Sequence, residues 1–222
     1  HRDLHSFPTR RSSDLIIKEM KEIPPHNFVA DLSRNQPETF SPPSPIATVV
    51  ALDCGIKNSI IRNLLKRGLK VVVVPFNTPY DQIMSYSPKG VLISNGPGDP
   101  LFCKETIDVC KQLIANQIPT MGICLGNILL GLAGGAKSFK MKFGHHGSSR
   151  PVKDMTAQRA YITGQFHDYA LDMDSLKATN FLPFFENLDD GTCEGIMHKN
   201  KLIFGVQFPP GPFPAPEDTN FL

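Results

Sequence analysis

Residues 118–133, IPTMGICLGNILLGLA, place a cysteine between two glycines at the junction of two apolar segments. The first segment, 118–123, predicts a buried strand, and the second, 127–133, predicts a helix. A cysteine at a strand-to-helix turn is typical of a nucleophile elbow, whose strained backbone needs small neighbours to fold tightly. We therefore expect Cys124 at a helix N-terminus, where the helix dipole favours the thiolate, with the Leu125 amide available to stabilise an oxyanion.

The segments around this junction alternate between strand and helix patterns. Apolar, β-branched runs predict strands at 48–52, 71–75 and 90–94, and helical spacing predicts helices near 60–67, 82–85 and 105–115. This alternation implies an α/β, three-layer, flavodoxin-like fold, with a mainly parallel sheet and helices on both faces. In that setting the elbow is favoured over a buried structural cysteine. From about residue 160 the pattern changes to short strands, which we expect to extend the sheet as an antiparallel edge.

The composition is that of an ordinary globular domain of 222 residues. The formal net charge of +2 does not indicate nucleic acid as a partner, and no apolar run is long enough to span a membrane. The five cysteines are odd in number and form no CxxC pair, which indicates reduced thiols and a cytoplasmic location. We predict no metal site, and we expect Cys54, Cys103, Cys110 and Cys193 to be inert core or surface thiols.

The N-terminal residues do not read as part of the domain. Residues 1–15 resemble a translated sequencing adapter and are predicted to be non-native. Residues 16–45 contain six prolines, which forbid a continuous helix or a central strand, so a linker after a missing N-terminal domain is expected there. The domain itself is expected over residues 46–222, cut short at its C-terminal end.

A second loop supports a ligand site at the same edge of the sheet. Residues 94–100, SNGPGDP, follow the strand at 90–94 and contain Gly96 and Gly98. Glycines at the carboxyl end of a parallel strand let backbone amides approach a ligand, and open α/β sheets bind ligands there. A tight turn without any ligand could have the same sequence, so the loop supports a ligand site only because the predicted elbow follows the next strand.

Several stretches together resemble one family. They are LISNGPGDP (92–100), PTMGICLGN (119–127), GAKSFKMKFGHHGSSRPVKD (135–154) and DCGIKNSIIRNLLKRG (53–68). Over about residues 49–219 the chain resembles the small subunit of glutamine-dependent carbamoyl-phosphate synthase, whose domain has the class I glutamine amidotransferase fold. The KFGHHG run distinguishes this family from other class I amidotransferases.

The resemblance implies a glutaminase that supplies ammonia through a cysteine thioester. Its partners would be L-glutamine and a large subunit, which makes carbamoyl phosphate for pyrimidine or arginine synthesis and alone uses ATP and Mg²⁺; no cofactor is expected in this domain. By position, Cys124 is the nucleophile, while Gly96, Gly98, Gln165 and the Leu125 amide belong to the glutamine and oxyanion site.

The chain departs from this family at five positions. Ile128 stands where the family ends its elbow with glutamine, and Phe166 and Asp168 replace the asparagine and glycine of a QNHG turn. Pro209 and Gly211 stand where the family has the histidine and glutamate of its catalytic triad. Single base changes would account for Pro209 and Gly211 but not for Ile128 or Phe166, so sequence errors explain the departures only in part.

These departures leave alternatives to an active glutaminase. A general base contributes roughly 10²- to 10⁴-fold to the rate, and without it the thiol pKa should return toward about 8.5. The chain could therefore be a catalytically impaired docking or regulatory domain, or a different cysteine hydrolase on the same fold. A substitute base could come from His145, His146 or His167, whereas His198 is expected to be a surface residue.

Overall fold

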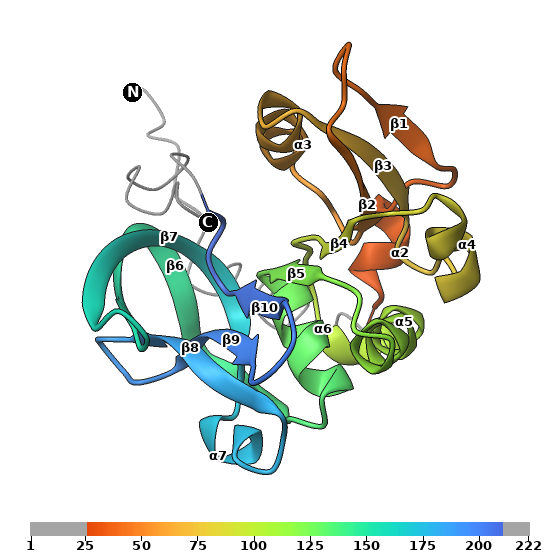
Figure 1. The fold of residues 1–222 in the computed structure, drawn as a ribbon. Helices are drawn as coiled ribbons and strands as arrows, with labels where there is room; N and C mark the ends of the chain where they lie inside the picture. The colour runs from red at the N-terminus through yellow and green to blue at the C-terminus, as the bar shows by residue number, and fades with distance from the viewer. Residues whose placement is uncertain (1–25, 211–222) are drawn as a thin grey trace, which may run out of the picture.

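A computed structural model of the chain describes residues 26–210. Within that range ten strands form one sheet, in the order β1-β3-β2-β4-β5-β10-β9-β7-β6-β8 (Figure 1). The expectations for residues 1–15, for 16–25 and for the C-terminal end of the domain lie outside the described residues. No helix in residues 26–210 is long and apolar enough to cross a lipid bilayer.

Five parallel strands form the centre of the sheet. They are β3 (Leu69–Pro75), β2 (Ala47–Asp53), β4 (Gly90–Ile93), β5 (Thr120–Ile123) and β10 (Ile203–Val206). The valine-rich runs suit this place because both faces of a central parallel strand are covered. Successive side chains then enter different cores: Val72 and Val74 join one cluster, and Val71 and Val73 the other.

Helices cover both faces, as the sequence predicts. On one face α3 (Asn58–Lys66) inserts Ile60 and Ile61, and on the other lie α5 (Lys104–Ala115) and α6 (Leu125–Ala133). The remaining helical segments of residues 26–210 are α2 (Phe28–Leu32), α4 (Tyr80–Ser85), η1 (Pro100–Phe102) and α7 (Met173–Leu176). The three-layer, flavodoxin-like architecture is therefore confirmed.

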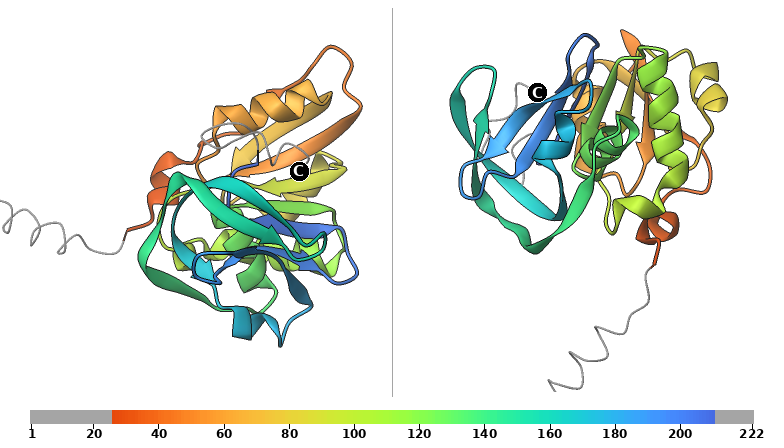
Figure 2. Two further views of the ribbon diagram at one scale, coloured as in Figure 1. Left: turned by 90° about the vertical axis from the view of Figure 1, so that its left-hand side faces the viewer. Right: turned by 90° about the horizontal axis from the view of Figure 1, so that it is seen from below.

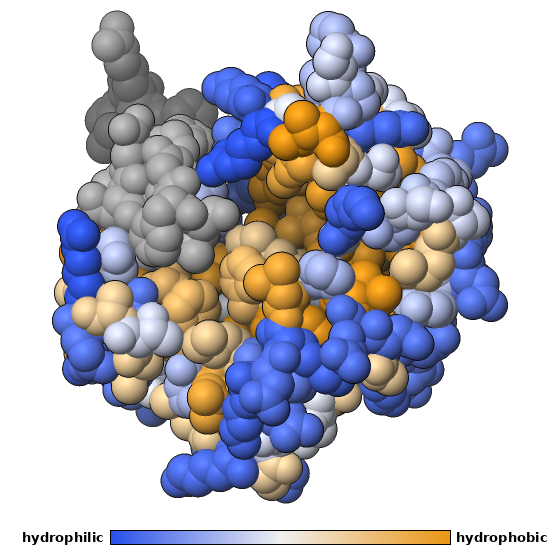
Figure 3. Space-filling view, viewed as in Figure 1, coloured by the Kyte–Doolittle hydropathy of each residue, from blue (hydrophilic) through white to orange (hydrophobic). Residues whose placement is uncertain are grey.

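Figure 3 shows an apolar hollow beside α3, which matches a groove over the amino-terminal ends of β4 and β5.

The second half of the chain adds an antiparallel lobe that curves away from the parallel strands (Figure 2). It consists of β6 (Ser138–Asp154), β7 (Arg159–Leu171), β8 (Phe181–Asn187) and β9 (Cys193–His198). The expectation of an antiparallel extension after residue 160 is right for β7 and β9. It is right only in part for β10, which runs antiparallel to β9 but parallel to β5 and so joins the lobe to the centre of the sheet.

Residues 26–45 correct the linker prediction. Helix α2 (Phe28–Leu32) buries Val29 to 1% exposure, and β1 (Glu38–Phe40) pairs antiparallel with β3 at the sheet edge. Arg34 anchors the segment through an ion pair with Asp53, 3.0 Å between Nε and Oδ2. The prolines exclude a central strand but not a short edge strand, so the folded domain begins before residue 46.

The structure also shows how far the other four cysteines and His198 are buried. Cys54, Cys103, Cys110 and Cys193 are fully buried in the core. His198 is only 6% exposed and stacks edge-on against Phe181, with 5.3 Å between ring centroids, so the prediction of a surface residue is wrong. It lies on β9, which β8 and β10 flank on both sides.

Candidate functional site

Cys124 occupies the turn between β5 and α6 in a strained backbone conformation. Its φ of 55° and ψ of −106° lie in a region that L-residues rarely adopt. A Cβ atom on Gly122 would lie 2.5 Å from the backbone of Gly126, and one on Gly126 would lie 2.7 Å from the carbonyl carbon of Ile93. Both glycines are thus required by close backbone approach, as an elbow demands.

The glycine loop after β4 lies against the end of β2, next to the elbow. A Cβ atom on Gly96 would lie 3.0 Å from the carbonyl carbon of Cys54, and Gly98 has a φ of +86°. Asn95 holds the loop in place by donating from Nδ2 to the Gly55 carbonyl oxygen at 2.9 Å. The sequence-predicted pair of loops therefore meets at the carboxyl edge of the sheet.

Two adjoining pockets, of about 200 and 290 Å³, share Cys124 as a lining residue. Both are lined by Gly96, Pro97, Cys124, Phe166 and Gln207. The smaller pocket adds Gly98, Leu125, Ile128 and His167, and the larger adds Lys57 and Pro209. A small polar ligand in either pocket would touch the thiol and the glycine loop together.

The thiol has an amide, not a base, as its hydrogen-bonding neighbour. Gln207 Nε2 donates to Cys124 Sγ at 3.8 Å, and Asn127 Nδ2 donates to Gln207 Oε1 at 3.0 Å. Burial raises the pKa of the Cys124 thiol to about 11, an effect that the Leu125 amide and Lys57 only partly offset. The pKa therefore lies above the value near 8.5 expected from the sequence, because desolvation outweighs the helix N-terminus.

Four of the five departures from the family pattern line the pockets beside this thiol. Pro209 lines the pocket and has no titratable group, while Gly211 lies outside the described residues. Ile128 is 2% exposed and gives the pocket an apolar wall, and Phe166 is 53% exposed beside both pockets. The assignment of Gln165 to the substrate site is wrong. Its side chain is fully buried, contacts His167 and lines neither pocket.

None of the histidines in residues 26–210 makes a hydrogen bond to Cys124. His145 lies between two carboxylates, Glu194 and Asp190, which raise its pKa to about 9. His146 is exposed and pairs with Asp168 at 3.0 Å. His167 reaches the pocket, and burial lowers its pKa.

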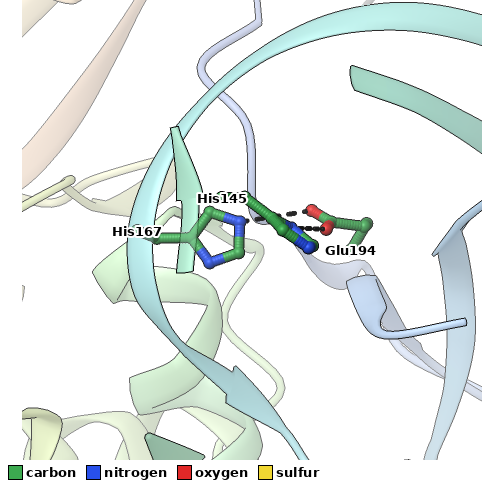
Figure 4. Close-up of side chains that lie close together, drawn as sticks. All are labelled: His145, His167 and Glu194. Carbon is green, nitrogen blue, oxygen red and sulfur yellow. Dashed lines mark hydrogen bonds and ion pairs between the residues drawn. The ribbon is translucent and has the colours of Figure 1, made fainter. Parts of the chain in front are cut away.

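Figure 4 shows the rings of His145, from β6, and His167, from β7, beside the carboxylate of Glu194, from β9. Sequence reasoning missed the functional potential of Glu194 and Gln207, since each lies in a short strand or its extension with no distinctive local motif. Only the topology brings β6, β7 and β9 together.

Comparison with known proteins agrees with this geometry. Residues 50–222 match the family described as glutamine amidotransferase class-I, and the chain belongs to that family. It is 46% identical over 206 residues to a carbamoyl phosphate synthase small chain from Methanopyrus kandleri, covering 93% of this chain and 56% of the relative. It is 47% identical to the same-named chain of Methanocaldococcus jannaschii, covering 93% and 58%. The chain thus spans about half the length of the curated relatives it matches.

Solved structures share the fold at low sequence identity. A candidate GMP synthase protein from Thermoplasma acidophilum superposes with a TM-score of 0.63 at 19% identity, covering 73% of this chain and 83% of that one. A glutamine amidotransferase from Thermotoga maritima gives a TM-score of 0.59 at 15% identity, covering 73% and 75%. These similarities support the α/β architecture.

Proposed function

We propose that this domain binds L-glutamine at the Cys124 pocket and supplies ammonia to a large subunit that makes carbamoyl phosphate. The proposal rests chiefly on one observation: a cysteine in a strained elbow conformation opens into a pocket beside a glycine loop. The similarity to carbamoyl phosphate synthase small chains suggests the substrate and the partner. ATP and Mg²⁺ would be used by the partner, and a cytoplasmic location remains our expectation.

The reaction would be an acyl transfer in two steps. The Cys124 thiolate attacks the carboxamide carbon of glutamine, the C–N bond breaks, and the leaving nitrogen takes a proton from solvent and departs as ammonia. Water then attacks the thioester, which releases glutamate and regenerates the thiol. The Leu125 amide would stabilise the oxyanion formed in each step.

A second candidate function, a docking domain with impaired catalysis, is favoured by the vacant base position. Pro209 lines the pocket where a histidine would accept a proton, and a thiol pKa of about 11 leaves about one molecule in 10⁴ ionised at pH 7. We therefore expect slow glutamine hydrolysis by this chain. The two candidates differ in turnover, whereas both predict binding to a large subunit.

Active-site labelling tests whether glutamine uses the Cys124 pocket. A chloroketone analogue of glutamine should alkylate Cys124, as located by peptide mass spectrometry, and excess L-glutamine should slow the labelling while L-glutamate at the same concentration should not. Labelling without glutamine protection, together with retained binding to a large subunit, would favour the docking function. Labelling of the other thiols alone would contradict the assignment of the pocket.

A further inference from the structure

Two imidazoles and a carboxylate converge beside the pocket, in the core of the antiparallel lobe. His145 Nδ1 lies 2.9 Å from Glu194 Oε1, and His167 Nε2 lies 3.7 Å from Glu194 Oε2. One ligand atom from each of these three residues can be chosen so that all three atoms lie within 4.8 Å of one another. Glu194 is fully buried, and its Oε2 has no hydrogen-bond partner. A buried carboxylate oxygen without a partner is costly, and a metal ion that displaces the proton between His145 Nδ1 and Glu194 would give it a partner.

The tautomer of His167 directs a bare nitrogen toward this point. Its Nδ1 lies 2.9 Å from the Tyr169 carbonyl oxygen, which can only accept, so Nδ1 carries the proton. A neutral ring then presents the Nε2 lone pair to Glu194 Oε2 and to Gln165 Oε1, the latter at 3.3 Å. The Gln165 amide nitrogen donates to Thr163 Oγ1, whose hydroxyl donates to the Arg150 carbonyl, and this fixes the Gln165 oxygen toward His167.

The surroundings are those of an outer coordination shell. Metal-bound histidines usually donate their second ring N–H to a carbonyl or a carboxylate, which orients the ring and raises its basicity. Here the Tyr169 carbonyl serves His167, and Asp190 Oδ2 lies 2.8 Å from His145 Nε2. Asn187 Nδ2 donates to Glu194 Oε1 at 3.1 Å, so the carboxylate is oriented as well.

We propose that His145 Nδ1, His167 Nε2 and the Glu194 carboxylate hold a divalent transition-metal ion, with Zn²⁺ as the best match to two imidazoles and one carboxylate. Ligand atoms about 2.0–2.1 Å from a tetrahedral zinc lie roughly 3.3 Å apart. His145 Nδ1 lies 2.9 Å from one Glu194 oxygen, His167 Nε2 lies 3.7 Å from the other, and the ligand atoms of the set lie within 4.8 Å of one another, so side-chain shifts would close the set around the ion. Gln165 Oε1 is placed to serve as a further oxygen ligand. This departs from the sequence analysis, which predicted no metal site.

Such an ion would join the lobe to the reaction site without touching the thiol. It would tie together β6, β7 and β9. The backbone carbonyl oxygen of Glu194 also accepts a hydrogen bond from the backbone N–H of Gln207, at 2.7 Å. Gln207 in turn is the residue that hydrogen-bonds to Cys124. The ion is therefore expected to stiffen the wall of the pocket that contains His167, as a positioning element independent of glutamine turnover.

The test measures metal uptake by the full 222-residue chain. After treatment with a chelator and dialysis against Zn²⁺, elemental analysis should find one equivalent bound, and Zn²⁺ should raise the melting temperature by several degrees. Glu194→Gln and His167→Ala should each lose that equivalent and the thermal shift. His146→Ala is the matched control, because His146 neighbours His145 but is exposed and paired with Asp168; it should bind as the parent does.

Cobalt distinguishes this site from binding by the cysteines. Co²⁺ in the proposed site should give weak visible bands without the intense near-ultraviolet absorption of thiolate-to-cobalt charge transfer, and Cys124→Ser should leave the spectrum unchanged. No uptake by the parent chain, or uptake unchanged in the isosteric Glu194→Gln, would overturn the proposal. The cluster would then be a proton-linked hydrogen-bond network.

Discussion

The substitution Gly126→Ala tests the close approach of α6 to β4, on which the elbow depends. A Cβ atom on Gly126 would lie 2.7 Å from the carbonyl carbon of Ile93 and closer still to its oxygen. Carbon atoms come into contact at roughly 3.5–4.0 Å, so the helix would have to move away from the strand by about 1 Å. Overpacking of this kind costs about 1–3 kcal/mol.

A second effect opposes the clash. Alanine is a better helix former than glycine by about 0.5–1 kcal/mol, and Gly126 lies in the first turn of α6. The clash is larger, so the net loss in the free energy of unfolding should be about 1–2 kcal/mol. For a domain of this size, that corresponds to a fall in melting temperature of about 2–8 °C.

Urea titration and thermal melting, both followed by circular dichroism, would measure this difference. Gly90→Ala is the matched control, because its Cβ atom would have its nearest neighbour at 3.4 Å, an ordinary contact, in a strand. The control should stay within about 0.5 kcal/mol of the parent. Equal stability of the two variants would refute the close approach of α6 to β4.

Two further predictions concern the thiol and the N-terminal segment. Since a pKa of about 11 leaves Cys124 protonated at neutral pH, its rate of alkylation by iodoacetamide should rise about tenfold per pH unit from pH 7 to 10; a rate that levels off near pH 8 would show that the thiolate is stabilised. Val29→Ala should lower the free energy of unfolding by about 1.5–3 kcal/mol, because it leaves a cavity at a buried position. Leu32→Ala, at a position that is 61% exposed, should lower it little. Equal effects of the two substitutions would argue that α2 does not pack on the core.

The sequence predicted the parallel centre well because its signals are local. A few neighbouring residues were enough to predict β2 and β3, from their valine-rich runs, and the turn at Cys124, from its two flanking glycines. The antiparallel lobe was harder, because β6 carries a polar face and bulges that break the strand pattern. The direction of β10 also depends on a partner, β5, about 80 residues earlier, and no local pattern records it.

The features of the site likewise divide into those with a local sequence pattern and those that depend on distant residues. The elbow and the glycine loop follow from sequence, but the raised pKa of Cys124 depends on burial by elements distant in the chain. The placement of Gln165 could not be foreseen, because it depends on which face of β7 turns inward at a bulged strand pair. His167, Glu194 and His145 meet only because three strands of the lobe lie together.

The most direct test of the account is ammonia release from glutamine, with a large subunit present, by the parent chain and by the double variant Pro209→His with Gly211→Glu. A restored base should raise the rate by roughly 10²- to 10⁴-fold, and Cys124→Ser should abolish release in both backgrounds. The account predicts slow release by the parent and a large gain in the double variant. Rapid release by the parent that Cys124→Ser abolishes would show that another group already serves as the base, and would contradict the account.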